Sequence, residues 1–120
     1  MLQNLNNCKS VELFGVFVDF VVIAEHPPNL CPHSNAVARK QLERLPEMNE
    51  MAKQLGIEMI FAGIPVPEHK TFMSLKAPSF EAVRSLMVQT GLVQTNTITI
   101  RQTESFEEFA KEIMTTTPLF

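Results

Sequence analysis

The sequence contains no tryptophan, no tyrosine and only two cysteines among its 120 residues. Two cysteines cannot build the disulfide framework of a small secreted domain, so Cys8 and Cys31 are expected to be free thiols in a reducing cytoplasm. Without tryptophan or tyrosine, stacking on bases would depend on phenylalanine alone. No run of lysine or arginine is present and the net charge is −3, so nucleic acid is not an expected partner.

Charge of either sign is also scarce, because charged residues make up only 19% of the chain. Hydrophobic residues make up 45%, enough for the core of one globular domain. The shortage of charge indicates that part of the surface is buried against another chain. The most apolar run, residues 11–24, is too short to span a bilayer and contains Glu12 and Asp19. We therefore expect a cytoplasmic protein that does not associate with a membrane.

Two regions can be distinguished along the chain. Residues 1–10 are polar and rich in asparagine, which is typical of a flexible leader, and residues 11–17 extend the first strand. Residues 1–17 are thus an N-terminal extension, and residues 18–120 form the domain. Apolar runs predict four strands, at residues 18–26, 57–64, 69–77 and 95–101.

Helices are expected between the first and second strands, between the third and fourth strands, and after the fourth. Each follows a residue that favours a helix N-terminus: Ser34 or Asn35, Ser79, and Ser105. Pro46 should kink the first of these helices or begin a second helical segment.

The order strand, helix, strand, strand, helix, strand predicts an α+β fold of the ferredoxin-like type. Right-handed crossovers give an antiparallel sheet of order 4-1-3-2, with helices on one face and an extra C-terminal helix. The first strand is nevertheless apolar on both faces, since Val21 and Ile23 alternate with Phe20, Val22 and Ala24. The uncovered face predicts a homodimer, or a higher homo-oligomer, formed by packing sheet against sheet.

The chain resembles the GYD-type proteins, which are small dimeric α/β-barrel proteins within the ferredoxin-like class and largely uncharacterised. The resemblance extends over residues 19–113 and rests on FVVIAE, AKQLGIE, LKAPSFEAVRSLM and TITIRQTESFEEF. It implies the fold and a dimeric barrel. Where the family has its Gly-x-Tyr-Asp signature, this chain has Pro67, Glu68, His69 and Lys70, so no role of that tyrosine and aspartate is carried over.

A cluster of metal-binding residue types follows from the topology. His26 ends the first strand and His69 begins the third, and these strands are antiparallel neighbours in the predicted sheet. The loop AEHPPNLCPHSN, residues 24–35, leaves the same edge and carries Cys31 and His33. Two imidazoles and a thiolate suit zinc, copper or iron, and a histidine could equally ligate haem.

In this interpretation His26, Cys31 and His69 are the ligands, with His33 or water as the fourth. Glu25 or Glu68 could orient an imidazole, and Asn96 could line the site from the start of the fourth strand. The sequence leaves alternatives open. The same residues could form a small-molecule pocket without metal, or serve only as structural residues.

Two functions are compatible with these patterns. The first is a dimeric ligand-binding protein with a site for a metal, haem or a small redox-active molecule, whether catalytic or not. The second is a non-catalytic oligomeric interaction or regulatory module that binds no metal.

Overall fold

The computed structural model describes residues 17–64 and 69–120. The predicted leader, the extension before Phe17, Cys8 and Glu68 lie outside these ranges. The strands are β1 (Val18–Glu25), β2 (Glu58–Gly63), β3 (Lys70–Ala77) and β4 (Thr97–Thr103). The helices are η1 (Pro28–Leu30), α2 (Ala36–Leu42), α3 (Leu45–Gln54), α4 (Phe80–Gln89), α5 (Leu92–Thr95) and α6 (Phe106–Met114).

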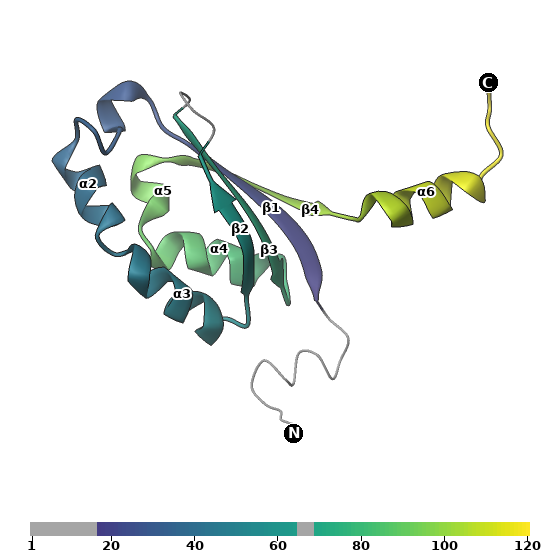
Figure 1. Ribbon diagram of the computed structural model, residues 1–120, viewed down its shortest axis with the longest axis horizontal. Helices are drawn as coiled ribbons and strands as arrows, with labels where there is room; N and C mark the ends of the chain where they lie inside the picture. The colour runs from purple at the N-terminus through teal and green to yellow at the C-terminus, as the bar shows by residue number, and fades with distance from the viewer. Residues whose placement is uncertain (1–16, 65–68) are drawn as a thin grey trace.

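The strands form one antiparallel sheet of order β2-β3-β1-β4, which is the predicted order read from the other edge. This order is compatible with a ferredoxin-like fold, and the α+β class is confirmed. Along the β1–β3 pair, Val18 lies opposite Ala77 and Glu25 lies opposite Lys70. The end of β1 and the start of β3 therefore meet at one edge of the domain (Figure 1).

Local chemistry sets the helix ends. The side chains of Asn35, Ser79 and Ser105 each accept a hydrogen bond from the backbone N–H three residues later. Pro46 occupies the first turn of α3, where its missing N–H costs nothing, so the chain makes a second helical segment rather than a kink.

The core lies between the sheet and the helices on one face. The alternation predicted for β1 is confirmed, because Phe20, Val22 and Ala24 are buried whereas Val21 and Ile23 are only partly so. The buried strand residues pack against side chains of α3 and α4 in one cluster. This cluster consists of Phe20, Val22, Met48, Ala52, Ile57, Met73, Leu75, Ala77, Val83, Leu86 and Met87.

A bulge in β2 changes which side chains share a face. The alternation in the sequence places Met59 and Phe61 on the same side, but the register shifts by one residue between them. Met59 lies opposite the buried Leu75, whereas Phe61 lies opposite Ser74 on the other face. The Phe61 ring lies over Gly63, since a Cβ on Gly63 would come within 2.7 Å of Phe61 Cζ.

The opposite face of the sheet, called the open face below, carries Val21, Ile23, Phe61 and Phe72. Within the described part of the chain, the core cluster lies wholly on the other side. Two ion pairs lie on the same face as these apolar side chains. Lys76 Nζ donates to Asp19 Oδ1 at 2.9 Å, which raises the pKa of Lys76, and Lys70 lies 3.7 Å from Glu25.

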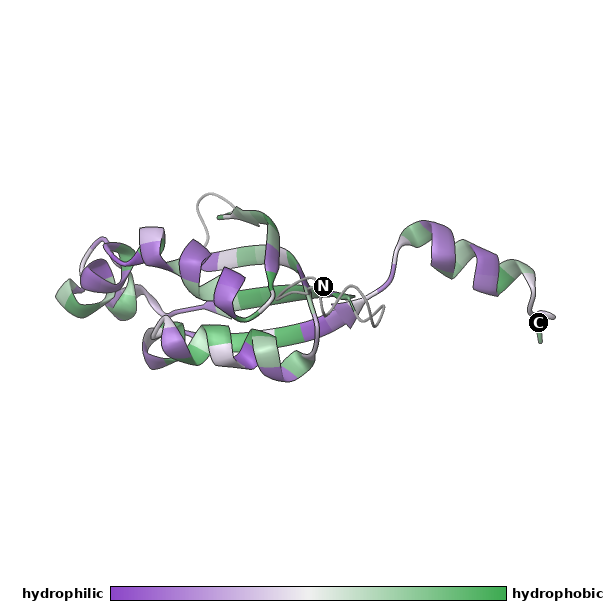
Figure 2. Cartoon of the chain, turned by 90° about the horizontal axis from the view of Figure 1, so that it is seen from below, coloured by the Kyte–Doolittle hydropathy of each residue, from purple (hydrophilic) through white to green (hydrophobic). Residues whose placement is uncertain are grey.

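Helix α6 extends away from the sheet beyond the end of β4 (Figures 1 and 2). Its apolar side chains are exposed, including Phe106 at 85% and Met114 at 84%. The radius of gyration is 17.1 Å, compared with about 14 Å for a compact domain of this length, and the projecting α6 contributes to the difference. None of the described helices is long and apolar enough to cross a bilayer.

Candidate metal centre

The meeting of β1 and β3 brings His26 and His69 together. The backbone N–H of His26 donates to the carbonyl of His69 at 3.1 Å, which continues the β1–β3 ladder by one residue beyond the strands. The two imidazole rings lie edge to face, with their centroids 5.3 Å apart. The antiparallel register thus places the two histidines side by side, although they are far apart in the sequence.

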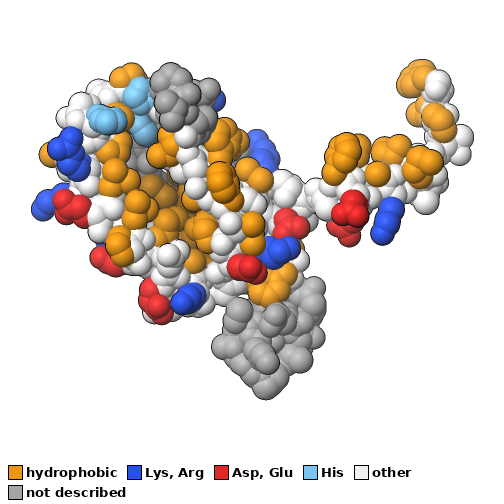
Figure 3. Space-filling view, in the orientation of Figure 1, with side chains coloured by type: hydrophobic (Ala, Val, Ile, Leu, Met, Phe, Trp, Pro, Cys, Tyr) orange, Lys and Arg blue, Asp and Glu red, His pale blue; other side chains and the backbone are white. Residues whose placement is uncertain are grey.

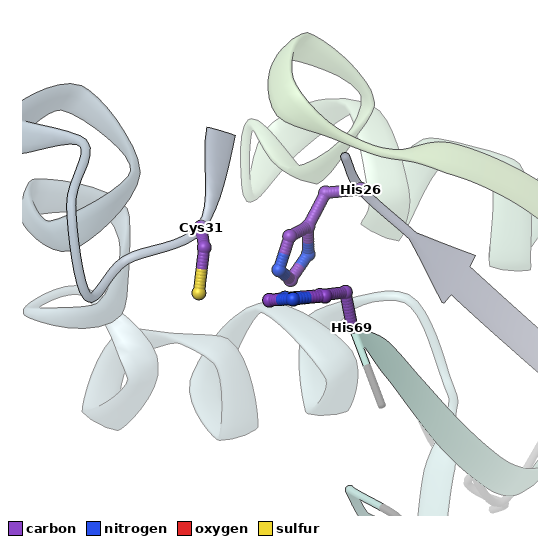
Figure 4. Close-up of side chains that lie close together, drawn as sticks. All are labelled: His26, Cys31 and His69. Carbon is purple, nitrogen blue, oxygen red and sulfur yellow. The ribbon is translucent and has the colours of Figure 1, made fainter. Parts of the chain in front are cut away.

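The proline-rich loop holds Cys31 in place. Pro28 begins the short helix η1, and the N–H of Cys31 donates to the Pro28 carbonyl. The Cys31 carbonyl in turn accepts from the N–H groups of Ser34 and Asn35 at 2.9 and 2.8 Å. Cys31 is a free, buried thiol, and its side chain points toward the two imidazoles (Figure 4).

The donor atoms of His26, Cys31 and His69 all lie within 4.8 Å of one another. In a tetrahedral zinc site, neighbouring donor atoms are about 3.3–3.6 Å apart. Side-chain rotations that move the donor atoms by about 1 Å would therefore bring all three within bonding distance of one ion. Cys31 is buried, His26 is partly buried and His69 is exposed. The group is therefore open on the side of His69.

A chain of hydrogen bonds behind His26 begins at the backbone of Gly91. This glycine has a φ of 80°, in the left-handed region, and precedes α5. Its carbonyl accepts from Gln41 Nε2 at 3.0 Å, and because a carbonyl can only accept, the orientation of the Gln41 amide is fixed. Gln41 Oε1 is then an acceptor, and it receives the hydroxyl proton of Thr95 at 2.8 Å.

The chain continues through Asn96 to the imidazole. Asn96 Nδ2 donates to the Leu92 carbonyl at 3.1 Å and to Thr95 Oγ1 at 3.2 Å. The amide oxygen of Asn96 therefore faces His26 Nδ1 at 3.1 Å and can only accept. Nδ1 must carry the proton, so neutral His26 presents a bare Nε2.

The bare nitrogen of His26 has no partner in the protein. Among the described residues, His26 Nε2 is the one buried side-chain nitrogen or oxygen without a hydrogen bond. Leaving such a group unpaired is costly, and an orphan atom of this kind calls for a ligand or a water. A metal ion requires this tautomer, with the other ring nitrogen held by a neighbouring acceptor.

A cavity of about 460 Å³ adjoins the three donors. Figure 3 shows the hollow, with apolar side chains below the histidines. His26, Cys31 and His69 line it at one end, together with Asn96. Apolar residues from the loop, α2, α3, β2 and α5 line most of the rest, including Leu30, Leu42, Leu45, Met48, Ile64 and Leu92.

The other predicted site residues lie near the group but outside it. His33 is exposed and lines the cavity, and its carbonyl accepts from Arg39 at 2.8 Å. Glu25 contacts Lys70 across the open face, so the neighbour that orients His26 is Asn96 rather than Glu25. Sequence reasoning missed Gln41, which looks like an ordinary polar helix residue when it is considered alone. It also missed Thr95, which the sequence pattern assigns to the fourth strand but which lies in α5, two residues before β4 begins.

Similarity to known proteins adds nothing to this geometry. Searches with the chain against family models, curated proteins and solved structures return no match. The chemistry of the site therefore rests on its own residues.

Proposed function

We propose that this protein binds one transition-metal ion through His26, Cys31 and His69 and uses the adjoining cavity to bind a small molecule. The observation that supports this most strongly is the buried, unpaired Nε2 of His26, whose tautomer is set by Asn96. Two imidazoles and a thiolate suit zinc, copper or iron. Three protein donors leave a coordination position for water or a substrate, as in catalytic rather than structural zinc sites.

We further propose that the protein works as a homodimer. The open face has an apolar centre of Val21, Ile23 and Phe72, with ion pairs on the same face. An apolar centre with a polar rim is the usual anatomy of a protein interface. Two such sheets packed face to face would form the dimeric α/β barrel implied by the resemblance to GYD-type proteins.

The test is the metal content and the ultraviolet–visible spectrum of protein purified without an affinity tag or chelator. We expect about one metal ion per chain, or the same stoichiometry after loading with Co²⁺, with a thiolate-to-cobalt charge-transfer band. The changes His26→Ala, Cys31→Ser and His69→Ala should each abolish stoichiometric binding, because two remaining donors hold an ion weakly.

The sequence offers matched controls for both residue types. His33→Ala removes an exposed histidine outside the group, so this variant should keep the metal. Cys8→Ser removes the other thiol of the sequence and should also keep the metal if Cys31 is the thiolate ligand. Circular dichroism verifies that each variant is folded. A Soret band would indicate haem instead, and a metal-free protein that takes up no cobalt would refute the metal site.

The second candidate is an oligomeric interaction module without metal, and α6 favours it. A helix of nine residues is not stable alone in water, yet its apolar side chains have no cover in the described chain. Under this hypothesis, His26→Ala would leave assembly and function intact. Deletion of residues 1–17 would disrupt assembly.

A further inference from the structure

We infer that the small molecule bound here has an apolar body and a single neutral or anionic donor atom, which takes the open position on the metal while the body fills the cavity. This inference rests on the proposed function and specifies the ligand class of the same site. It follows from the juxtaposition of three candidate metal donors with a mostly apolar cavity in which the side chains of Gln41, Asn96, Thr90 and Thr95 are already hydrogen-bonded.

Part of the apolar wall consists of residues that have the spacing of a core but are not buried. Leu42 and Leu45 continue the helical stripe that Met48 and Ala52 begin, yet they are 45% and 52% exposed. Ile64, at the end of β2, is 63% exposed and lines the same cavity. Apolar side chains left in water around a hollow gain free energy when an apolar molecule covers them.

Four of the polar side chains in the wall, those of Gln41, Asn96, Thr90 and Thr95, have little left to offer a ligand. Both amide protons of Gln41 are used, on the Gly91 carbonyl and on Gln94 Oε1. Both amide protons of Asn96 are used as well, and the hydroxyl groups of Thr90 and Thr95 donate within the protein. A ligand with many polar groups would lose its hydrogen bonds to water here without replacement.

The charges around the cavity restrict the donor atom. Among the described residues that line the cavity, Arg44 and Lys70 are cationic and none is an aspartate or glutamate, and the ammonium group of Lys70 lies toward Glu25 on the open face. Arg44 pairs with Glu47 at 3.5 Å and Lys70 with Glu25 at 3.7 Å, so the cations are partly neutralised. The charges around the cavity are compatible with a neutral or anionic donor group, such as an imidazole, thiolate or phenolate, but not with a cationic donor group. A cavity of about 460 Å³ is large enough for one such molecule.

The experiment compares two probes that share a donor and differ only in their apolar body. Co²⁺-loaded full-length protein is titrated with imidazole and with 4-phenylimidazole, and the cobalt absorption reports coordination. We expect 4-phenylimidazole to bind about 10- to 100-fold more tightly, because its ring covers apolar surface in the cavity.

A pair of variants tests whether the cavity causes this preference. Leu45→Gln, in the wall, should remove most of the advantage of 4-phenylimidazole and leave imidazole affinity unchanged. Val37→Gln is the matched control, because Val37 is an exposed apolar residue on α2 that does not line the cavity. Both changes are on exposed helix positions, so both variants should fold.

Each outcome bears on a different claim. Equal affinities for the two probes, or a preference that survives Leu45→Gln, would refute the ligand class while metal binding stands. Equally tight binding of 4-phenylimidazole to metal-free protein, measured by calorimetry, would refute coordination of the ligand head. Absence of cobalt binding would refute the proposed function together with this inference.

Discussion

The cavity and the open face are both apolar surfaces that the described part of the chain leaves uncovered, and they differ in shape and in chemistry. The cavity on the helix side is concave and adjoins three candidate metal donors, and several of its polar side chains are hydrogen-bonded within the protein. The open face on the other side of the sheet is part of an extended surface, and ion pairs accompany its apolar residues. The comparison teaches that exposed apolar area does not by itself indicate the kind of partner, because the concave surface suits a small molecule and the extended one suits a protein.

The largest effect is expected from a charge placed on the open face. Phe72→Asp puts a carboxylate at the centre of the proposed dimer interface, where it would be buried without a partner. We expect the dimer to weaken by about 30-fold or more and the chain to become monomeric at micromolar concentration, as measured by analytical ultracentrifugation.

Val88→Asp serves as the control, since Val88 is an exposed apolar residue on α4, away from the open face. This variant should keep the oligomeric state of the unmodified protein. Metal content should be unchanged in both variants, which separates the two surfaces. A monomeric unmodified protein, or a Phe72→Asp variant that still dimerises, would contradict the proposed interface.

An intermediate effect is expected from the residue that orients His26. Asn96→Leu removes the acceptor for His26 Nδ1, so the imidazole is no longer held in the metal-binding tautomer. Loss of such a partner typically lowers metal affinity about 10- to 100-fold. Competition with a chelator of known affinity measures this, and nitrogen NMR of the imidazole reports the tautomer.

The conservative change tests whether Asn96 acts through hydrogen bonding or only through packing. Asn96→Asp keeps an acceptor for His26 Nδ1 but loses the two hydrogen bonds that Asn96 Nδ2 donates, so affinity should fall less than in Asn96→Leu and the Nδ1–H tautomer should be retained. Gln94→Leu removes a peripheral member of the chain of hydrogen bonds and should have little effect. Equal losses in all three variants would indicate a purely structural role.

The smallest effect is expected just before α6, at Glu104. Glu104 has a raised pKa because of partial desolvation and the nearby carboxylates of Glu112 and Glu108. Because the pKa of Glu104 is raised in the folded protein, its protonated form stabilises the fold. This contribution is complete at pH values below the pKa of the unfolded chain, and it is lost as the pH rises through the folded-state pKa. Glu104→Gln should therefore give a slightly higher helix content than the unmodified protein at neutral pH and no difference at acidic pH.

Circular dichroism as a function of pH measures this difference. A difference that persists at acidic pH would show that the carboxylate charge is not its cause. The effect stays small because these carboxylates are exposed and screened by solvent.

The sequence predicts the fold and the centre of the site better than it predicts their surroundings. The strand order follows from the alternation of strands and helices, and the meeting of His26 and His69 follows from that order alone. The direction of each imidazole could not be predicted, because a shift of one residue reverses a side chain. Such a shift does occur in β2, where the bulge separates Met59 from Phe61.

The hydrogen bonds behind His26 were beyond prediction for a different reason. They join Gln41 on α2 to Thr95 and Asn96 around α5, a helix of four residues that no periodicity indicates. The cavity could not be predicted from the sequence either, because Leu42 and Leu45, which line it, have the spacing of core residues. Only the three-dimensional structure separates a leucine that fills a core from one that lines a hollow.

The fixed direction of the hydrogen bonds from Gly91 to His26 also determines which protons an incoming ion displaces. In the neutral tautomer that Asn96 selects, Nε2 carries no proton, so an ion bound there would displace none from His26. The Cys31 thiol is the buried donor that would have to ionise. We therefore expect metal uptake at the proposed site to release the proton of Cys31, while the hydrogen bond from His26 Nδ1 to Asn96 persists from the empty protein to the loaded one.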